Sequence, residues 1–229
     1  MAEFLVFTLA APMGAFGDLA GHERRGSNLW PGRSAILGLI GAALGVRRDD
    51  AEGQAALDAW RVAVAVLHAG TALRDYHTVQ TVPSTIKRPN SRHEALAEAR
   101  RKGILNTVLT SRDYLTDCAF SVAIWGGDDA PALEQALRQP VFVPYLGRKS
   151  CPLAAPMAPR LIEAADPVAA LAGAQLPPWL PFTQPQMIAS DAFAGLAGRE
   201  ETRWDQPLDR STWHFAPRRV QIIVPEGQS

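Results

Sequence analysis

A short segment in the first half of the chain combines side chains that could either act on a ribose or bind one. It reads Arg74-Asp75-Tyr76-His77-Thr78. A histidine beside a tyrosine could deprotonate a ribose 2′-hydroxyl, and Lys87 downstream could serve as a further acid or base. A His-Tyr pair at the end of a strand, such as Tyr76 and His77, is more often structural or a binding contact. Acid–base catalysis and simple binding both stay open for this segment.

A second candidate is a loop that follows a short apolar run. Its residues are Tyr145, Leu146, Gly147, Arg148, Lys149, Ser150 and Cys151. An aromatic ring can stack on an unpaired base while arginine and lysine hold phosphates, which suits single-stranded nucleic acid. An ordinary polar turn would have a similar composition.

The third candidate lies at the start of a predicted helix, where Gly32, Arg33 and Ser34 precede apolar residues at helical spacing. An anion there would meet a guanidinium, a hydroxyl and backbone N–H groups aligned with the helix dipole. The arrangement predicts a seat for a phosphate or an RNA backbone. Alternatively, Ser34 only caps the helix and Arg33 is solvated.

Metal ions and other cofactors are not expected. The histidines show no metal-ligand spacing; they are His22, His68, His77, His93 and His214. Gly38, Gly41 and Gly45 lie inside the predicted helix with the spacing G-x-x-G-x-x-x-G, which is not a dinucleotide-binding fingerprint. Cys118 and Cys151 stand alone, so neither a disulfide framework nor a cysteine-based zinc site is predicted.

The overall composition is that of an ordinary globular protein. The 229 residues are 47% hydrophobic, with 23 Lys and Arg against 23 Asp and Glu. The apolar opening lacks the positive flank of a signal peptide, and no stretch reaches the ~18 apolar residues of a membrane span. Because isolated cysteines suit a reducing compartment, we expect a cytoplasmic protein that does not associate with a membrane.

Positive charge gathers in one long connection, between Thr81 and Arg112. Its basic residues are Lys87, Arg88, Arg92, Arg100, Arg101, Lys102 and Arg112, against Glu94 and Glu98, so its net charge is 7 − 2 = +5. Connections of this length are usually functional or disordered. Residues 94–102 have a helix-forming composition, and a solvated surface excursion is the alternative interpretation.

These segments are positioned by an alternation of predicted strands and helices. Strands are predicted at residues 4–9, 61–68, 114–125, 141–146 and 218–224, and helices at 34–45 and 130–138. The order strand, helix, strand, insertion, strand, helix, strand is that of an α+β, ferredoxin-like or RRM-type domain. The proline-rich region after residue 151 predicts an irregular extension that wraps around the same domain.

Several segments in order resemble the CasD subunits of type I-E CRISPR Cascade complexes (CRISPR-associated protein family five), a family within the RAMP superfamily of RNA-binding proteins. The resemblance covers residues 3–157 and rests on Ala11-Pro12-Met13-Gly14-Ala15-Phe16-Gly17, the Arg33-Ser34 helix through Leu44-Gly45 with Arg48-Asp49-Asp50 after it, Arg74-Asp75-Tyr76-His77-Thr78, Arg112-Asp113-Tyr114-Leu115-Thr116-Asp117, and Pro144-Tyr145-Leu146-Gly147-Arg148-Lys149-Ser150-Cys151-Pro152-Leu153. It implies a ferredoxin-like RNA-binding domain over residues 1–157, a basic inserted thumb at about 79–112 and a C-terminal extension over 158–229.

The resemblance also implies a function and a set of RNA contacts. We expect a non-catalytic subunit that holds the 5′ handle of a CRISPR RNA, contacts the repeating backbone subunit and the large subunit, and meets target DNA through the assembled complex. The expected contacts are Phe16, Arg25, Arg33, Ser34, Tyr76, His77, Tyr145, Gly147, Arg148, Lys149, Ser150 and Cys151, with Lys87, Arg88, Arg92 and Arg112 on the thumb. The alternative is a metal-independent endoribonuclease that processes the CRISPR precursor RNA through Tyr76, His77 and Lys87.

Overall fold

The apolar N-terminal segment forms the central strand of a large sheet. In the computed structural model, which describes residues 1–20, 23–86, 91–209 and 214–225, this strand lies between two antiparallel neighbours. Leu5, Phe7 and Leu9 face one hydrophobic core, and Phe4 and Val6 face another. The strand predicted at residues 4–9 is therefore confirmed, and it is covered on both faces as its continuous apolar pattern indicates.

Fifteen helices and strands occur within the described residues. In chain order they are β1 Ala2–Gly14, β2 Phe16–Ala20, β3 Arg24–Asn28, α1 Arg33–Leu44, α2 Ala51–Leu57, β4 Arg61–His68, β5 Thr71–Thr81, α3 Arg92–Arg101, β6 Asn106–Trp125, α4 Ala130–Arg138, β7 Arg160–Ala164, α5 Pro167–Leu171, β8 Met187–Ser190, β9 Arg199–Asp209 and β10 His214–Ile223.

One mixed sheet organises these elements into an α+β fold. Its central part has the order β7-β1-β6-β4, with every neighbouring pair antiparallel. Strands β8, β10 and β9 continue the sheet beyond β4, and the hairpin of β2 and β3 joins β6 through a short parallel pairing. Side chains of α1 and α4 pack into the larger core on one face, and α5 packs on the other face.

Helix α1 begins and ends for reasons that the sequence shows only in part. Gly45 has φ of 79° and its N–H bonds to the last turn of the helix, so this glycine ends α1 in the left-handed conformation. The prediction that Ser34 caps the helix is wrong. Gly32 is the N-cap, and the N–H of Arg33 donates to Asp205 Oδ2 at 2.9 Å.

The strand predicted at residues 141–146 is also wrong. The N–H groups of Val141 and Phe142 instead bond to carbonyl groups of Ala43 and Ala42 in the last turn of α1, and only Tyr145 forms an isolated bridge. Strand β7 pairs with the edge of β1 that β6 leaves open. The strand that follows α4 in the sheet therefore begins at residue 160, about twenty residues later than predicted.

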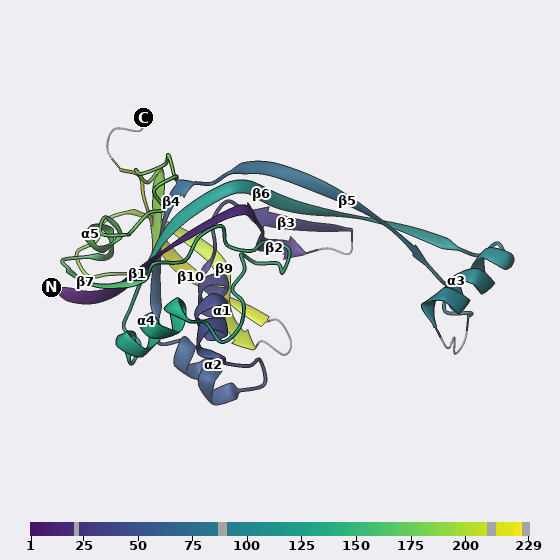
Figure 1. Cartoon of the computed structure of the whole chain (residues 1–229), viewed down its shortest axis with the longest axis horizontal. Helices are drawn as coiled ribbons and strands as arrows, with labels where there is room; N and C mark the ends of the chain where they lie inside the picture. Colours follow the sequence, from purple (N-terminus) through teal and green to yellow (C-terminus); the bar gives the residue numbers. More distant parts are fainter. Residues whose placement is uncertain (21–22, 87–90, 210–213, 226–229) are drawn as a thin grey trace.

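A long two-stranded arm extends from the body (Figure 1). It consists of β5 and the first half of β6, paired from Thr71 opposite Thr116 to Thr81 opposite Asn106. Helix α3 lies at its tip and packs Ala95 and Ala99 against Ile86 in a small core of its own. The insertion predicted at 79–112 lies within this arm, whose strands begin eight residues earlier. We call residues 71–116 the arm.

The C-terminal part of the chain is more regular than predicted. Residues 175–186 contain no strand or helix, but β7, β8, β9 and β10 all join the sheet. The expectation of an irregular extension is therefore corrected. The prolines that suggested it cluster before β8, and the ladder between β9 and β10 tolerates Pro217 at a register shift between Ala216 and Arg218.

Candidate nucleic-acid interface

Three arginines from separate segments meet where the arm leaves the body. The parallel pairing of β3 with β6 places Arg25 beside Arg112, and paired residues of neighbouring strands share a face. Tyr114 lies two residues further along β6, so its side chain is on the face of Arg112. The Arg148 guanidinium stacks 4.4 Å from the centre of the Tyr114 ring, and its Nη2 donates to the Arg25 carbonyl oxygen at 3.4 Å. We call Arg25, Arg112 and Arg148 the basic cluster.

The charge of the basic cluster is not compensated by the part of the protein that the structure describes. None of the three guanidinium groups forms an ion pair with a described carboxylate, and Nη1 of Arg148 is buried without a hydrogen-bond partner. Asp75 lies opposite Arg112 in the arm but bonds His77. Because neighbouring like charges repel, the cluster would be stabilised by an anion such as a phosphate.

Tyr114 experiences this positive environment directly. Burial alone would raise the pKa of its hydroxyl, but hydrogen bonds from Arg148, Ser150 and Arg112 outweigh burial, so the pKa lies below its usual value. The phenol of Tyr114 therefore lies in the electrostatic surroundings of Arg112 and Arg148. Sequence reasoning did not single out Tyr114 for this position, although its i,i+2 spacing from Arg112 placed the two on one strand face.

The loop that carries Arg148 is fixed by backbone contacts. Gly147 has φ of 81°, and a Cβ at this position would overlap the carbonyl oxygen of Ala15. Ala15 N–H bonds to Leu146 O at 3.1 Å, while Leu146 N–H bonds to Cys151 O at 2.8 Å. This geometry requires glycine at position 147 and fixes the loop that carries Arg148 against Ala15. Lys149 and Ser150 are exposed on the same loop, but the Cys151 side chain is completely buried and cannot touch RNA.

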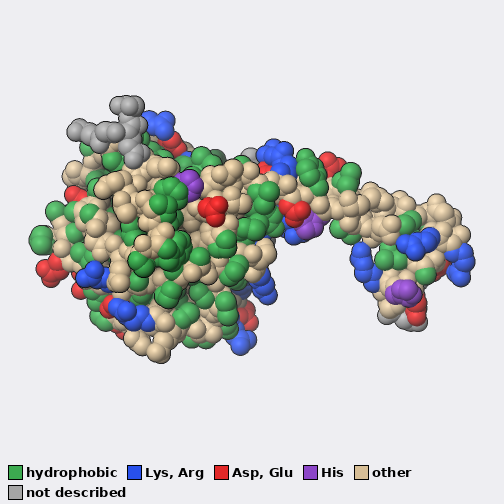
Figure 2. All heavy atoms as spheres, turned by 45° about the horizontal axis from the view of Figure 1, so that its top comes forward, with side chains coloured by type: hydrophobic (Ala, Val, Ile, Leu, Met, Phe, Trp, Pro, Cys, Tyr) green, Lys and Arg blue, Asp and Glu red, His purple; other side chains and the backbone are tan. Residues whose placement is uncertain are grey.

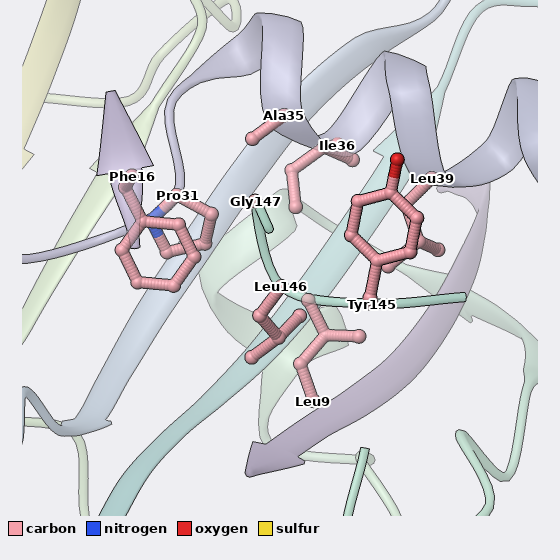
Figure 3. A pocket seen from close by; sticks show the side chains of 9 residues that line it. All are labelled: Leu9, Phe16, Pro31, Ala35, Ile36, Leu39, Tyr145, Leu146 and Gly147. Carbon is pink, nitrogen blue, oxygen red and sulfur yellow. The ribbon is translucent and has the colours of Figure 1, made fainter. Parts of the chain in front are cut away.

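Tyr145 and Phe16 line a small apolar hollow beside α1 (Figure 3). The Tyr145 ring lies near Leu39 and is partly exposed. Phe16 is different, because its ring is buried and packs edge to face with Phe120 at 5.4 Å between centroids. The expectation that Phe16 contacts RNA through its side chain is corrected by this burial.

The expected phosphate seat at the start of α1 is filled by the protein itself. Arg33 is only 5% exposed, and its guanidinium donates to Asp191 Oδ2 at 3.1 Å and to the carbonyl groups of Trp60 and Asp58. Burial lowers the pKa of Arg33, although nearby Asp191 counteracts it. Asp205 occupies the anion position at the helix terminus, where a Cβ on Gly32 would lie 2.7 Å from Asp205 Oδ2.

These contacts belong to a buried network that joins both halves of the chain. Arg218 on β10 donates to Asp205 and Asp191, and Val62 N–H donates to Asp191 Oδ2 at 2.8 Å. Burial would lower the pKa of Arg218, but these two carboxylates raise it above its usual value. Arg33 therefore has a structural role, and the prediction that it binds RNA is corrected. Ser34 is half-buried beside it.

The remaining predicted residues are spread along the arm. Tyr76 and His77 are neighbours on β5 and so project from opposite faces of it, which separates the suggested acid–base pair. His77 bonds the Asp75 carboxylate. Arg92 lies at the tip and donates to Gln80 O at 2.9 Å. Lys87 and Arg88 lie outside the described residues.

A second charged group, missed in the sequence, lies on the other face of the arm root. Asp113 accepts hydrogen bonds from Arg74 Nε at 2.7 Å and from Arg24 Nη2 at 2.9 Å. Bonds from Arg74 and then Arg24 lower the pKa of Asp113 to about 2. The i,i+39 spacing between Arg74 and Asp113 gives no signal in the sequence, since it depends on hairpin register.

The described ranges contain neither a metal-binding cluster nor a membrane-spanning helix. No three His, Cys, Asp or Glu side chains there are grouped so that they could hold a metal ion. Within the same ranges, no helix combines the length and apolar character needed to cross a membrane.

Comparison with known proteins gives matches over most of the chain. A family model described as "CRISPR-associated protein (Cas_Cas5)" matches residues 4–221. The CRISPR system Cascade subunit CasD of Escherichia coli (strain K12) is 37% identical over 190 residues, covering 75% of this chain and 76% of that protein.

Two solved structures are also similar. One, described as a CRISPR RNA-guided surveillance complex, has a TM-score of 0.68 at 24% identity and covers 96% of this chain and 89% of that chain. Another, described as a crystal structure of a Cas protein, has a TM-score of 0.62 at 27% identity and covers 99% of this chain and all of the other.

Proposed function

Because the chain belongs to the Cas5 family of CRISPR-associated proteins, we propose that it is a non-catalytic subunit of a type I-E Cascade complex that holds the 5′ handle of the CRISPR RNA. The cytoplasmic location expected from the cysteine usage belongs to the same proposal. Its handle site is the basic cluster at the root of the arm, extended by Tyr145, Gly147, Lys149 and Ser150 on the neighbouring loop.

The observation that carries this proposal is the convergence of Arg25, Arg112 and Arg148 around Tyr114 without a described counter-charge. Guanidinium groups bind phosphates in a planar, two-pronged geometry, which suits an RNA backbone. Tyr145 on the same loop offers a partly exposed ring for an unpaired base. A single-stranded RNA segment satisfies both features.

The finer architecture belongs to the same proposal. The central order β7-β1-β6-β4, antiparallel throughout, supports a ferredoxin-like body in which the arm takes the place of the thumb. The division near residue 157 stays a prediction. We propose that the arm reaches the repeating backbone subunit and the body reaches the large subunit, while guide pairing reads the target DNA.

A non-catalytic role is favoured over the endoribonuclease alternative. General acid and base groups must both reach one ribose and its phosphate. Tyr76 and His77 project from opposite faces of β5, so they cannot approach the same ribose from one side. His77, turned toward Asp75 on the face of the basic cluster, is proposed as a binding contact.

Co-purification tests the proposal. The tagged chain is expressed with its neighbouring operon products and a CRISPR array, and the bound RNA is extracted and sized. We expect a large particle with a short guide RNA that persists in His77→Ala, whereas R112A/R148A loses RNA. Arg219→Ala is the control, because Arg219 is exposed and pairs with the exposed Glu200. Unprocessed precursor RNA in the His77→Ala particle would make this protein the nuclease. If the unaltered chain formed no particle, the proposal that it is a subunit of a Cascade complex would be refuted.

A further inference from the structure

The middle of the arm is free of charge, unlike either end. We call the end of the arm nearest the body the root. Four paired positions separate the root from the tip: residues 78–81 of β5, Thr-Val-Gln-Thr, face residues 106–109 of β6, Asn-Thr-Val-Leu. We call these eight residues the stem. At ~3.3 Å per residue the stem spans about 13 Å. Figure 2 shows this band without Lys or Arg between the coloured root and the tip.

Charged residues resume on both sides of the stem. Arg74, Asp75, Arg112 and Asp113 lie toward the body, and Arg92, Glu94, Glu98, Arg100, Arg101 and Lys102 lie at the tip. A nucleic-acid backbone carries one charge per nucleotide and is held by cations. The stem residues carry none, and the Arg92 and Arg100 side chains that fold back from the tip bond Gln80 on β5. The β6 side of the stem is therefore not suited to bind RNA or DNA.

The stem instead presents apolar side chains to solvent. Leu109 is 62% exposed, and Tyr76, diagonal to it on the same face of the arm, is 71% exposed. On the opposite face Val79 and Val108 are direct cross-strand partners and are 37% and 41% exposed. A two-stranded ribbon with exposed apolar residues is marginally stable by itself, which indicates that a partner covers it.

One backbone edge of the stem is also open. On β6, strand β3 pairs only at Ser111 and Arg112, and the Ser111 N–H bonds to Glu23 O at 2.7 Å. Beyond that point, no described strand pairs with this edge of residues 106–110. The edge of β5 is partly covered, because Gln80 O accepts a bond from Arg92. The β6 edge carries no proline, lysine or bulge of the kind that normally discourages pairing.

We propose that an uncharged, extended strand of a neighbouring protein subunit pairs with the β6 edge at residues 106–110 and covers Leu109 and Tyr76. The occupant is protein because residues 106–110 offer β-forming side chains, open backbone groups and no charged side chain, which complements a neutral polypeptide strand. The inference rests on the proposed function, since the partner is a subunit of the same complex. It divides the arm into a root that binds RNA and a stem that binds protein.

Leu109→Lys tests the division, with Val143→Lys as the matched control. A lysine on an edge strand hinders pairing, and Val143 is an equally apolar residue, 79% exposed, on the body. The readouts are co-purification of protein subunits after ribonuclease treatment and the affinity of the isolated chain for handle RNA. We expect L109K to retain at least about tenfold less protein while its RNA affinity stays within about twofold, because charge is added away from the basic cluster. V143K should match the unaltered chain in both.

Hydrogen exchange then tests backbone pairing itself. In the complex, amides among residues 106–110 should exchange at least about tenfold more slowly than in the isolated chain. Unchanged exchange, or normal assembly of L109K, overturns the inference. A concentration-dependent dimer that L109K abolishes without affecting the complex makes a second copy the occupant and also overturns it. In all these cases RNA binding at the root persists, whereas an unaltered chain that binds neither RNA nor subunits refutes the proposed function.

Discussion

Removal of the basic cluster should change the salt dependence of RNA binding by a calculable amount. In R25A/R112A/R148A, three guanidinium groups that lack described carboxylate partners are lost. Each phosphate contact on a single strand contributes about 0.7 to the slope of log affinity against log salt. Three contacts therefore contribute about 2 to that slope. Between 50 and 200 mM salt, the unaltered chain should lose about twentyfold more affinity than the triple variant.

The assay is fluorescence anisotropy of labelled single-stranded handle RNA across that range of salt. The control is R61A/R160A/R219A, which removes the same formal charge from exposed positions of the body. If the effect were due to net charge, both triple variants would lower the slope equally. An equal change in both variants, or a change below about 0.5 in the cluster variant, refutes the assignment of three phosphate contacts.

Two further predictions concern ion pairs within the chain. Asp191→Ala leaves the buried Arg33 unpaired and should lower the free energy of unfolding by about 3–5 kcal/mol in urea titrations, against less than about 1 kcal/mol for the exposed Glu200→Ala. The pKa of Asp113 is about 2 in the folded chain and about 3.9 in the unfolded chain. The stability that its ion pairs contribute is therefore complete above about pH 3.9 and is lost as the pH falls toward 2. An NMR titration of the Asp113 carboxyl group should give a midpoint near pH 2, and Arg74→Ala should raise that midpoint. A midpoint near pH 4 in the unaltered chain would contradict the ion pairs with Arg74 and Arg24.

Local patterns predicted those elements whose cause is local. Helix α4 matches its predicted bounds because Asp129 accepts a bond from Ala132 N–H and a proline follows in the first turn. Strand β4 matches residues 61–68 because its alternating valines face the main core. Gly45 ends α1 through a left-handed conformation that its residue type favours.

Features that depend on distant partners could not be predicted. Val-Phe-Val at residues 141–143 has the composition of a strand, yet in the folded chain β7 occupies the edge of β1. Arg33 has the composition of an anion-binding residue, but Asp191 and Asp205, more than 150 positions later, supply its anions. Phe16 reads as an exposed loop aromatic until Phe120 is seen to pack against it.

The candidate interface also combines features that local patterns predict with features that depend on distant partners. The sequence points to the Tyr145–Cys151 loop because an aromatic ring and two cations occur together there, and to Arg112 because it belongs to the basic connection. Their meeting with Arg25 requires the register of β3 with β6, a parallel pairing of only two positions. Residue type therefore identified the chemistry, whereas strand register selected which of the candidates share a surface.

The buried network around Arg33 also constrains how the protein can be made. Asp191 lies 158 positions after Arg33, and Asp205 lies 172 positions after it. While the chain is being synthesised, α1 cannot dock with its arginine neutralised until these carboxylates have left the ribosome, because a buried unpaired charge is strongly unfavourable. Folding of the body must therefore await nearly the whole polypeptide, and a nascent chain stalled before residue 191 would remain a client for chaperones.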